Sequence, residues 1–512
     1  MLFNSFEFVF VFLPVVWLVY FSVARFGGAK AAIWSLSIAS MAFYAWWNPV
    51  YLLLIVGEVV LCFLLGAAIT SEQRTPAQRR MLTFAGIGIV LGVLGYFKYT
   101  NFLLSTLNVA VGTDFHPLEI ILPLGISFHS FQQIAYLADC YAGRAPRYDF
   151  SKYSLFVTFF PQLIAGPIVH HHEIIPQFGR PGALSPRAVN ISAGLAIFAV
   201  GLFKKTIIAD SLAQVAVPIF DAAAGGQALT VTEAWYGALS YSLQLYFDFS
   251  AYSDMAIGLA LLFNLRLPLN FFSPYKATSI ADFWRRWHMS LSRFLRDYIY
   301  IPLGGNRHGP GRKSVNLMIT MLLGGLWHGA GWTFVIWGAL HGLYLLLHSL
   351  WVQATGGRFA KVPGYRFVAW ALTFLAVVIA WVFFRADRLD TALSMLGSMF
   401  LLSDEALRHG TPHFKHLLLH GWQLILLTGI VALCAPNTYQ LFRRYRPALP
   451  TYDFVRRVAA ARPAARGRVP WRLGWRPAWR STWAWGIACG LVLGIAICGI
   501  AGWQADFLYF QF

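Results

Sequence analysis

The fold is decided in residues 279–352, which read SIADFWRRWHMSLSRFLRDYIYIPLGGNRHGPGRKSVNLMITMLLGGLWHGAGWTFVIWGALHGLYLLLHSLWV. The first part combines basic side chains with tryptophans, whereas the part from Ser314 to Val352 contains no Asp, Glu, Lys or Arg. One membrane crossing needs about 20 apolar residues, so the uncharged part is long enough for two membrane helices. The glycine cluster in LLGGLWHGAGW marks the end or break of the first of them.

A histidine, His328, lies inside this uncharged run. It follows Lys313, a predicted interfacial anchor, by fifteen residues, which at 1.5 Å per residue places it roughly 22 Å into the bilayer. An ionisable residue at that depth is by default a functional hypothesis. From position alone, however, a hydrogen bond between helices is the favoured interpretation. His341 and His348, on the second helix, are predicted to be packing or interfacial residues.

The basic segment that precedes this run is predicted to form one amphipathic helix. At 100° per residue, Trp287 falls on its apolar arc, and Asp282 and Arg286 fall opposite with the spacing of an i, i+4 ion pair. His288 lies at the edge of the apolar arc, beside Trp284. The His288 side chain is therefore expected to point inward.

Composition places the chain in a membrane. Of its 512 residues, 58% are hydrophobic and only 12% are charged, and the mean hydropathy is +0.58. These values are far more apolar than those of a soluble domain. The sequence predicts an all-α polytopic membrane protein, a helical bundle with about 10 to 12 transmembrane spans plus re-entrant and interfacial helices.

The first spans are expected at residues 8–24, 31–47 and 51–70. Basic residues fall on alternate loops between them, so the positive-inside rule predicts that the N-terminus lies outside. Residues 118–140 are apolar but dotted with polar side chains. Such a segment is predicted to be re-entrant or to line a cavity, because irregular backbone at membrane depth must be buried in protein or wet.

The net charge of +19 indicates cytoplasmic loops and anionic lipid headgroups as the partners of the basic residues. No nucleic-acid motif is visible, so nucleic acid is not expected as a partner. Residues 437–481 are predicted to be a basic cytoplasmic interfacial linker within a single membrane domain that spans residues 1–512. Tryptophans recur every four residues from Trp471 to Trp483, which is typical of an amphipathic interfacial segment. Docking of an acidic partner is the alternative.

Neither a metal site nor a pair of catalytic carboxylates is predicted. Residues 170–173 read HHHE, but consecutive residues on a helix cannot all face one ion. Asp248 and Asp254 are embedded acids six residues apart, so they point in different directions. They are expected to anchor arginine or backbone donors around the site, because buried charges are paired.

Three stretches, 247–258 (FDFSAYSDMAIG), 270–309 (which contains ADFWRRWHMSLSRFLRDYIYIPLGGNRHG) and 322–343 (LLGGLWHGAGWTFVIWGALHGL), closely resemble the membrane-bound O-acyltransferases. The branch that they resemble most contains the bacterial alginate O-acetyltransferase membrane subunit. The terminal FLYFQF also looks like that branch. By this resemblance, His328 is the catalytic residue and His288 the second polar site residue. The resemblance further implies O-acetylation of an extracellular polysaccharide from the bacterial inner membrane, often completed by a separate periplasmic acetyltransferase.

Acyl transfer from a thioester to a hydroxyl needs a base for the hydroxyl proton and donors for the oxyanion. We hypothesise that His328 is the base and that His288 orients the acceptor or polarises the thioester carbonyl. Trp284, Trp287 and Trp327 are expected to wall the acyl channel, and Asp248 and Asp254 are assigned to the same substrate channel. The expected donor is acetyl-CoA or another acyl thioester from the cytoplasm, with no bound cofactor. The expected acceptor is a polysaccharide such as alginate, or a periplasmic partner protein.

A lipid or solute transporter, or flippase, is the alternative function. Transporters also carry embedded polar residues, but their halves are often related by repeats. No internal repeat is visible in this sequence.

Overall fold

The computed structural model describes residues 1–402, 415–449, 451 and 478–508. Within these residues every regular element is helical, and the extended backbone forms one isolated parallel bridge, between Pro268 and Leu449. The predicted all-α class is therefore confirmed. Most of the predicted linker 437–481, including Trp471 and Trp475, lies outside the described residues.

Seven helices of the described part are long and apolar enough to cross a membrane. By their residues they are Phe8–Ala45, Val50–Ile69, Pro76–Val111, Ala188–Ala224, Trp332–Thr355, Tyr365–Arg385 and Trp483–Ile500. The chain is thus a multi-pass membrane protein.

The chain divides into two compact units. The first unit comprises residues 1–202, 252–269 and 438–500, and the second comprises residues 203–251, 270–437 and the chain from Ala501 onward. The helix α10 (Val231–Leu262) contributes its beginning to the second unit and its end to the first.

In the first unit, with η for a short 3₁₀ or π-helix, the elements are η1 (Phe8–Phe12), α1 (Leu13–Ala45), α2 (Val50–Ile69), α3 (Pro76–Val111), α4 (Ile126–Tyr141), α5 (Phe150–Thr158), α6 (Phe160–Leu163), α7 (His171–Ile174), η2 (Ile175–Gln177), α8 (Ala188–Phe203), α18 (Thr438–Leu441), η8 (Arg443–Tyr445) and α20 (Trp483–Ile500).

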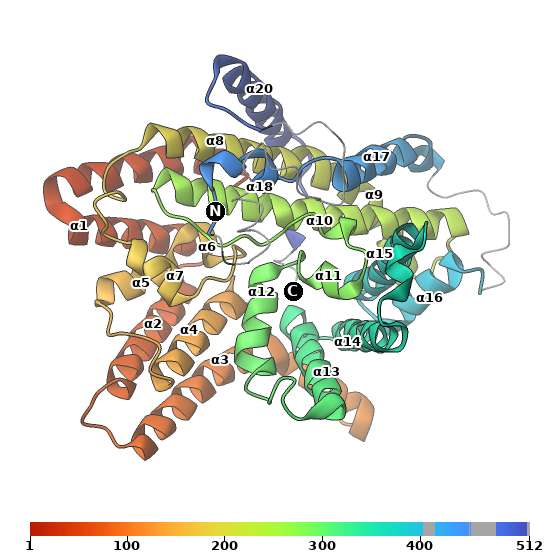
Figure 1. Ribbon diagram of the computed structural model, residues 1–512, viewed down its shortest axis with the longest axis horizontal. Coiled ribbons are helices and arrows are strands. Elements are labelled where there is room, and N and C mark those ends of the chain that lie inside the picture. The colour runs from red at the N-terminus through yellow and green to blue at the C-terminus, as the bar shows by residue number, and fades with distance from the viewer. Residues whose placement is uncertain (403–414, 450, 452–477, 509–512) are drawn as a thin grey trace. The chain divides into compact units, whose positions relative to one another are not determined.

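The helix α1 doubles back on itself, and Figure 1 shows it as two arms. The turn lies at Gly28, whose φ of 79° and ψ of −179° are not helical. As a result Phe43, near the end of α1, packs on Phe8 and Phe12 with ring centroids 5.8 Å and 5.6 Å apart. One helical element thus holds both of the first two predicted spans.

The helices α2, α3 and α4 pack against one another. Most of residues 118–140, the segment predicted to be re-entrant or to line a cavity, forms the buried helix α4. Contacts between the helices account for its polar side chains. Glu58 of α2 lies 2.9 Å from Nδ1 of His129, and the Gln133 amide donates to the same carboxylate at 3.1 Å. The polar face of α4 is therefore turned toward an acid on the neighbouring helix, since a buried carboxylate is costly without partners.

In the second unit, besides the beginning of α10, the elements are η3 (Lys204–Ala209), α9 (Asp210–Ala224), η4 (Pro274–Lys276), α11 (Ile280–Trp284), α12 (Met289–Leu295), η5 (Arg296–Tyr300), α13 (Gly309–His328), α14 (Trp332–Thr355), η6 (Arg358–Lys361), α15 (Tyr365–Arg385), α16 (Leu389–Met399) and α17 (Lys415–Cys434).

The backbones of helices α13 and α14 pack closely against each other at two glycines, Gly325 and Gly338. A Cβ on Gly325 would lie 2.3 Å from the Phe334 carbonyl oxygen, and a Cβ on Gly338 would lie 2.5 Å from the Met321 carbonyl oxygen. Only glycine fits at these contacts, in the manner of small-residue packing between membrane helices. The contact fixes the end of α13, at His328, against the first turns of α14.

The prediction of one continuous amphipathic helix in the basic segment is wrong. The chain forms α11, breaks, and resumes as α12 at Met289. At the break His288 has a left-handed backbone, with φ of 40° and ψ of 54°. The helix breaks because the chain at 270–272 takes over its backbone hydrogen bonds: the Met289 N–H donates to the Asn270 carbonyl at 2.9 Å, and the Arg286 carbonyl accepts from the Phe272 N–H at 2.9 Å.

We expect Gly338→Ala to destabilise the protein by about 1–3 kcal/mol, because the added methyl must force α13 and α14 apart. Thermal unfolding in detergent micelles, followed by tryptophan fluorescence, measures the change. Gly397→Ala is the matched control, since a Cβ there meets nothing within 4 Å and alanine favours a helix. Equal stabilities of the two variants would show that the close backbone contact is unimportant.

Candidate functional site

Two buried histidines that are distant in the sequence meet in the second unit. The ring centroids of His288 and His328 lie 6.2 Å apart, and the two residues are 0% and 3% exposed. The ring of Trp327 contacts both, with its centroid 5.8 Å from that of His288 and 4.9 Å from that of His328. The structure therefore brings together the two residues that the sequence singled out.

The orientation of His288 is set by Asn270. The side-chain oxygen of Asn270 accepts from the Ser290 hydroxyl at 2.8 Å and lies 3.0 Å from Nδ1 of His288. Because this oxygen can only accept, Nδ1 carries the ring proton and Nε2 keeps a lone pair. Burial lowers the pKa of His288 to about 3, so the ring is neutral at neutral pH.

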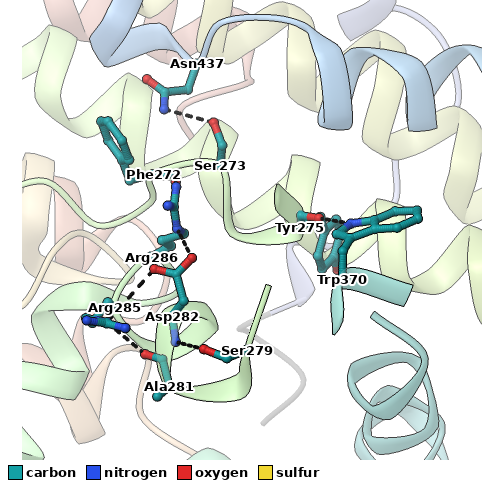
Figure 2. A network of polar contacts seen from close by, with 10 residues as sticks. All are labelled: Phe272, Ser273, Tyr275, Ser279, Ala281, Asp282, Arg285, Arg286, Trp370 and Asn437. Carbon is teal, nitrogen blue, oxygen red and sulfur yellow. Dashed lines mark hydrogen bonds and ion pairs between the residues drawn. The ribbon is translucent and has the colours of Figure 1, made fainter. Parts of the chain in front are cut away.

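The loop and helix that carry His288 are held by a polar network (Figure 2). The Ser279 hydroxyl caps α11 by accepting from the Asp282 N–H at 3.1 Å. Arg286 pairs with Asp282 at 2.9 Å, which confirms the predicted i, i+4 pair. Arg286 also donates to the carbonyl of Phe272 at 3.4 Å. These bonds tie α11 to the chain just before it.

Two further contacts in Figure 2 fix that preceding chain from other elements. The Asn437 amide donates to the Ser273 hydroxyl at 3.0 Å, and the Trp370 indole of α15 donates to the Tyr275 carbonyl at 2.9 Å. Segments far apart in the sequence therefore hold the loop from which Asn270 reaches His288.

His328 ends α13 inside an aromatic shell. Its ring centroid lies 4.9 Å from that of Trp337 and 5.2 Å from that of Phe384. The Trp337 ring lies in turn 4.7 Å from that of His341. Trp337 and Phe384 were not singled out from the sequence, and His341 was predicted to be a packing or interfacial residue. The signal that points to this face is the i, i+4 spacing of Trp337 and His341 on an uncharged helix.

The predicted wall tryptophans occupy different places. Trp327 contacts both histidines of the site. Trp284 lies against His341, to whose Nδ1 its indole N–H donates at 3.3 Å. Trp287 packs on Trp381, with ring centroids 4.9 Å apart.

Asp248 belongs to a buried charge cluster next to the site. Its carboxylate lies 3.1 Å from the amine of Lys205, which lies 2.8 Å from Asp210, and all three side chains are at most 4% exposed. The cluster also binds the C-terminal segment: the Leu508 N–H donates to Asp248 at 3.0 Å, and Lys205 donates to the Ala505 carbonyl at 2.9 Å.

Phe249, which follows Asp248 in the sequence, contacts His288. The Phe249 ring lies 4.7 Å from that of His288 and 6.3 Å from that of Phe507. Asp248 thus anchors a backbone donor beside the site, and a lysine takes the place of the expected arginine. Asp254 lies in the first unit, where the Thr438 hydroxyl donates to its carboxylate.

A second cluster of histidines lies in the first unit. Asp139, His170 and His172 bring their potential metal-ligand atoms within 4.8 Å of one another. The Asp139 oxygens also contact Arg144 at 2.8 Å and His171 at 2.9 Å. Because the His170 ring accepts from a backbone N–H, its neutral form carries a proton on the other nitrogen, which cannot then bind a metal. Asp139 and His170 thus have protein partners of their own.

Comparison with known proteins gives consistent matches. The model of the membrane-bound O-acyltransferase family matches residues 135–388. A peptidoglycan O-acetyltransferase of Helicobacter pylori is 42% identical over 485 residues, which cover 86% of this chain and 91% of that protein. A probable alginate O-acetylase of Pseudomonas putida is 42% identical over 462 residues, covering 88% and 90%. A teichoic acid D-alanyltransferase of Streptococcus thermophilus is 26% identical over 238 residues, covering 45% and 57%.

We expect Lys205→Met to destabilise the protein by about 3–5 kcal/mol, because it leaves two buried carboxylates without their cation. Lys204→Met is the matched control: the half-buried Lys204 donates to the Ser250 hydroxyl, so its loss should cost only about 0.5–1.5 kcal/mol. Thermal unfolding in micelles compares the two variants. If both lose the same stability, the buried cluster does not support the fold in the way described.

Proposed function

Because the chain belongs to the membrane-bound O-acyltransferase family, we propose that its paired buried histidines transfer an acyl group from a thioester to a hydroxyl. The observation that carries this proposal is the meeting of His288 and His328 at 6.2 Å inside an aromatic enclosure. O-acyl transfer is the activity in the names of the relatives of highest identity described above. The transporter alternative is not favoured, because these relatives are named as acetyltransferases and acetylases.

His328 is the general base of the proposed reaction. A neutral imidazole is the side chain best suited to take a hydroxyl proton near neutral pH. As the acceptor oxygen attacks the thioester carbonyl carbon, the hydroxyl proton passes to His328. When the carbon–sulfur bond breaks, the same proton passes to the departing thiolate. The products are an ester and a free thiol, and His328 returns to its neutral form.

His288 positions the acceptor in this proposal. With Nδ1 directed to Asn270, its Nε2 offers a lone pair to a hydroxyl group. The ring is neutral, so it accepts a hydrogen bond without competing for the proton that His328 must take. A hydroxyl held between the two rings has its oxygen oriented for attack, which converts a bimolecular step into a positioned one.

The aromatic shell limits the competing reaction. Water would hydrolyse the thioester, so the site must admit a hydroxyl acceptor and exclude bulk water. Trp327, Trp337 and Phe384 surround the His328 ring with apolar surface. Together with Trp284 and Trp287, these side chains are the proposed wall of the acyl channel.

The substrates follow from membrane position and from the relatives. We propose acetyl-CoA or another acyl thioester as the cytoplasmic donor, and a surface polysaccharide or a periplasmic acetyltransferase as the acceptor. The relatives act by name on peptidoglycan and alginate. The proposed location is the bacterial inner membrane with the N-terminus outside, which the basic residues on alternate loops support.

Replacing His328 with Ala is expected to abolish acyl transfer, a loss of at least about 10³-fold in kcat/KM, while the protein level stays unchanged. His308→Ala is the matched control, because His308 lies in an exposed loop. The assay follows thiol release from acetyl-CoA by purified protein supplied with a polysaccharide acceptor. Normal turnover by the His328→Ala variant would show that His328 is not the general base.

Asn270→Asp is expected to make the activity sensitive to acid. A carboxylate beside Nδ1 stabilises the imidazolium, so it raises the pKa of His288 from its value of about 3 toward neutral pH. As the pH falls through the raised pKa, His288 becomes protonated and Nε2 loses its lone pair. The kcat of the variant should therefore decline between about pH 7.5 and 5.5, and that of the wild type should vary less. Parallel pH profiles would contradict the positioning role.

A further inference from the structure

Trp337 carries a polar group that the fold leaves unused. The residue is 0% exposed, and its indole N–H has no hydrogen-bond acceptor among the described residues. Its ring lies face to edge with that of His328, at 4.9 Å and 82°. Buried N–H groups nearly always have a partner, so an exception beside a reactive histidine needs an explanation.

His341 adds a second such group one helical turn away. Its Nδ1 accepts from the Trp284 indole at 3.3 Å, so the proton of the neutral ring is on Nε2. That Nε2 is also buried and has no partner in the part of the chain that the structure describes. Trp337 and His341 are spaced i, i+4 on α14, which places both on one face of the helix, and their ring centroids are 4.7 Å apart.

The two groups are donors of the same kind on one face of α14, and the Trp337 ring contacts the rings of both His341 and His328. Each is an N–H fixed by a ring that is packed on all sides, so neither needs to reorganise to meet an acceptor. Acyl transfer to a hydroxyl develops negative charge on the carbonyl oxygen, and donors fixed in advance in a water-excluded site stabilise such charge most effectively. The base and the positioning residue described above supply no donor for this oxygen.

We propose that the Trp337 indole N–H and the His341 Nε2–H form the oxyanion-binding pair of the site, with the carbonyl oxygen of an acyl thioester as their ligand. This inference rests on the proposed acyl transfer. When the acceptor oxygen attacks, a carbon–oxygen bond forms and the carbonyl electron pair moves onto the oxygen held by the two donors. When that pair returns, the carbon–sulfur bond breaks and the thiolate leaves with the proton that His328 held.

The decisive variant is Trp337→Phe, which keeps the aromatic packing and removes only the N–H and the smaller ring of the indole. Trp235→Phe is the matched control, since the Trp235 N–H donates to the Met399 carbonyl at 2.8 Å and its loss removes an indole donor outside both the proposed pair and the polar network that holds His288. With acetyl-CoA and a polysaccharide acceptor, kcat of the Trp337 variant should fall by about 10²–10³-fold. KM should change by less than about threefold, because the lost interaction is made mainly in the transition state. The control should keep its kcat within about threefold.

A binding experiment tests the same contact without turnover. Two inhibitors are compared: an acetyl-CoA analogue with a methylene in place of sulfur, which is a ketone, and the matching analogue with no carbonyl. Wild type and Trp235→Phe should prefer the ketone by about tenfold, as expected for hydrogen bonds from buried donors. Trp337→Phe and His341→Phe should each lose most of that preference.

Equal weakening of both analogues would assign Trp337 a purely structural role and overturn the inference. So would unchanged kcat and ketone preference in Trp337→Phe, or a wild type that does not distinguish the analogues. Failure of the general-base proposal looks different: His328→Ala would then remain active, and the ketone preference would still depend on Trp337.

Discussion

The close contact between the backbones of α13 and α14 is the constraint on which the site depends. At Gly325 and Gly338 the two helices are so near that a methyl group on either residue would overlap a carbonyl oxygen of the other helix. Between membrane helices, where lipid competes for apolar side chains, such close packing supplies much of the attraction. The contact holds His328, at the end of one helix, beside the ring of Trp337 on the other. A looser crossing would separate the proposed base from the groups around it.

Buried charge in this protein is organised in small, self-contained clusters. Glu58 lies against His129 and Gln133 in the first unit, and Lys205 lies between Asp210 and Asp248 in the second. In each cluster, contacts with neighbouring side chains compensate for part of the hydration that burial removes. The second cluster also determines where the C-terminal segment runs, because both Lys205 and Asp248 bind its backbone. Phe507 of that segment packs in turn on Phe249, whose ring contacts that of His288.

The break between α11 and α12 shows where periodicity misleads. The pattern of apolar and charged residues from Ile280 onward fits one helix, and its first turn has the predicted Asp282–Arg286 pair. The chain nevertheless leaves the helix at His288, because Asn270 offers competing partners to both the backbone and the imidazole. Those partners come from a segment that no helical spacing connects to His288. The left-handed backbone at His288 is a conformation of the kind found at functional sites, where the surroundings compensate for the strain.

The sequence by itself determined that this chain is an all-helical membrane protein and where α13 ends, and it predicted His288 and His328 as site residues. These features follow from the sequence because hydropathy, helix-ending glycines and family motifs are all signals that lie within short stretches of consecutive residues. Only the tertiary structure decided that the two rings meet, that Asn270 sets which nitrogen of His288 carries the proton, and that Lys205 and the C-terminal segment bind Asp248. The role proposed for Trp337 and His341 also depends on the tertiary structure. Whether an N–H has an acceptor depends on the atoms around it, and those atoms come from helices that lie side by side only in the folded protein.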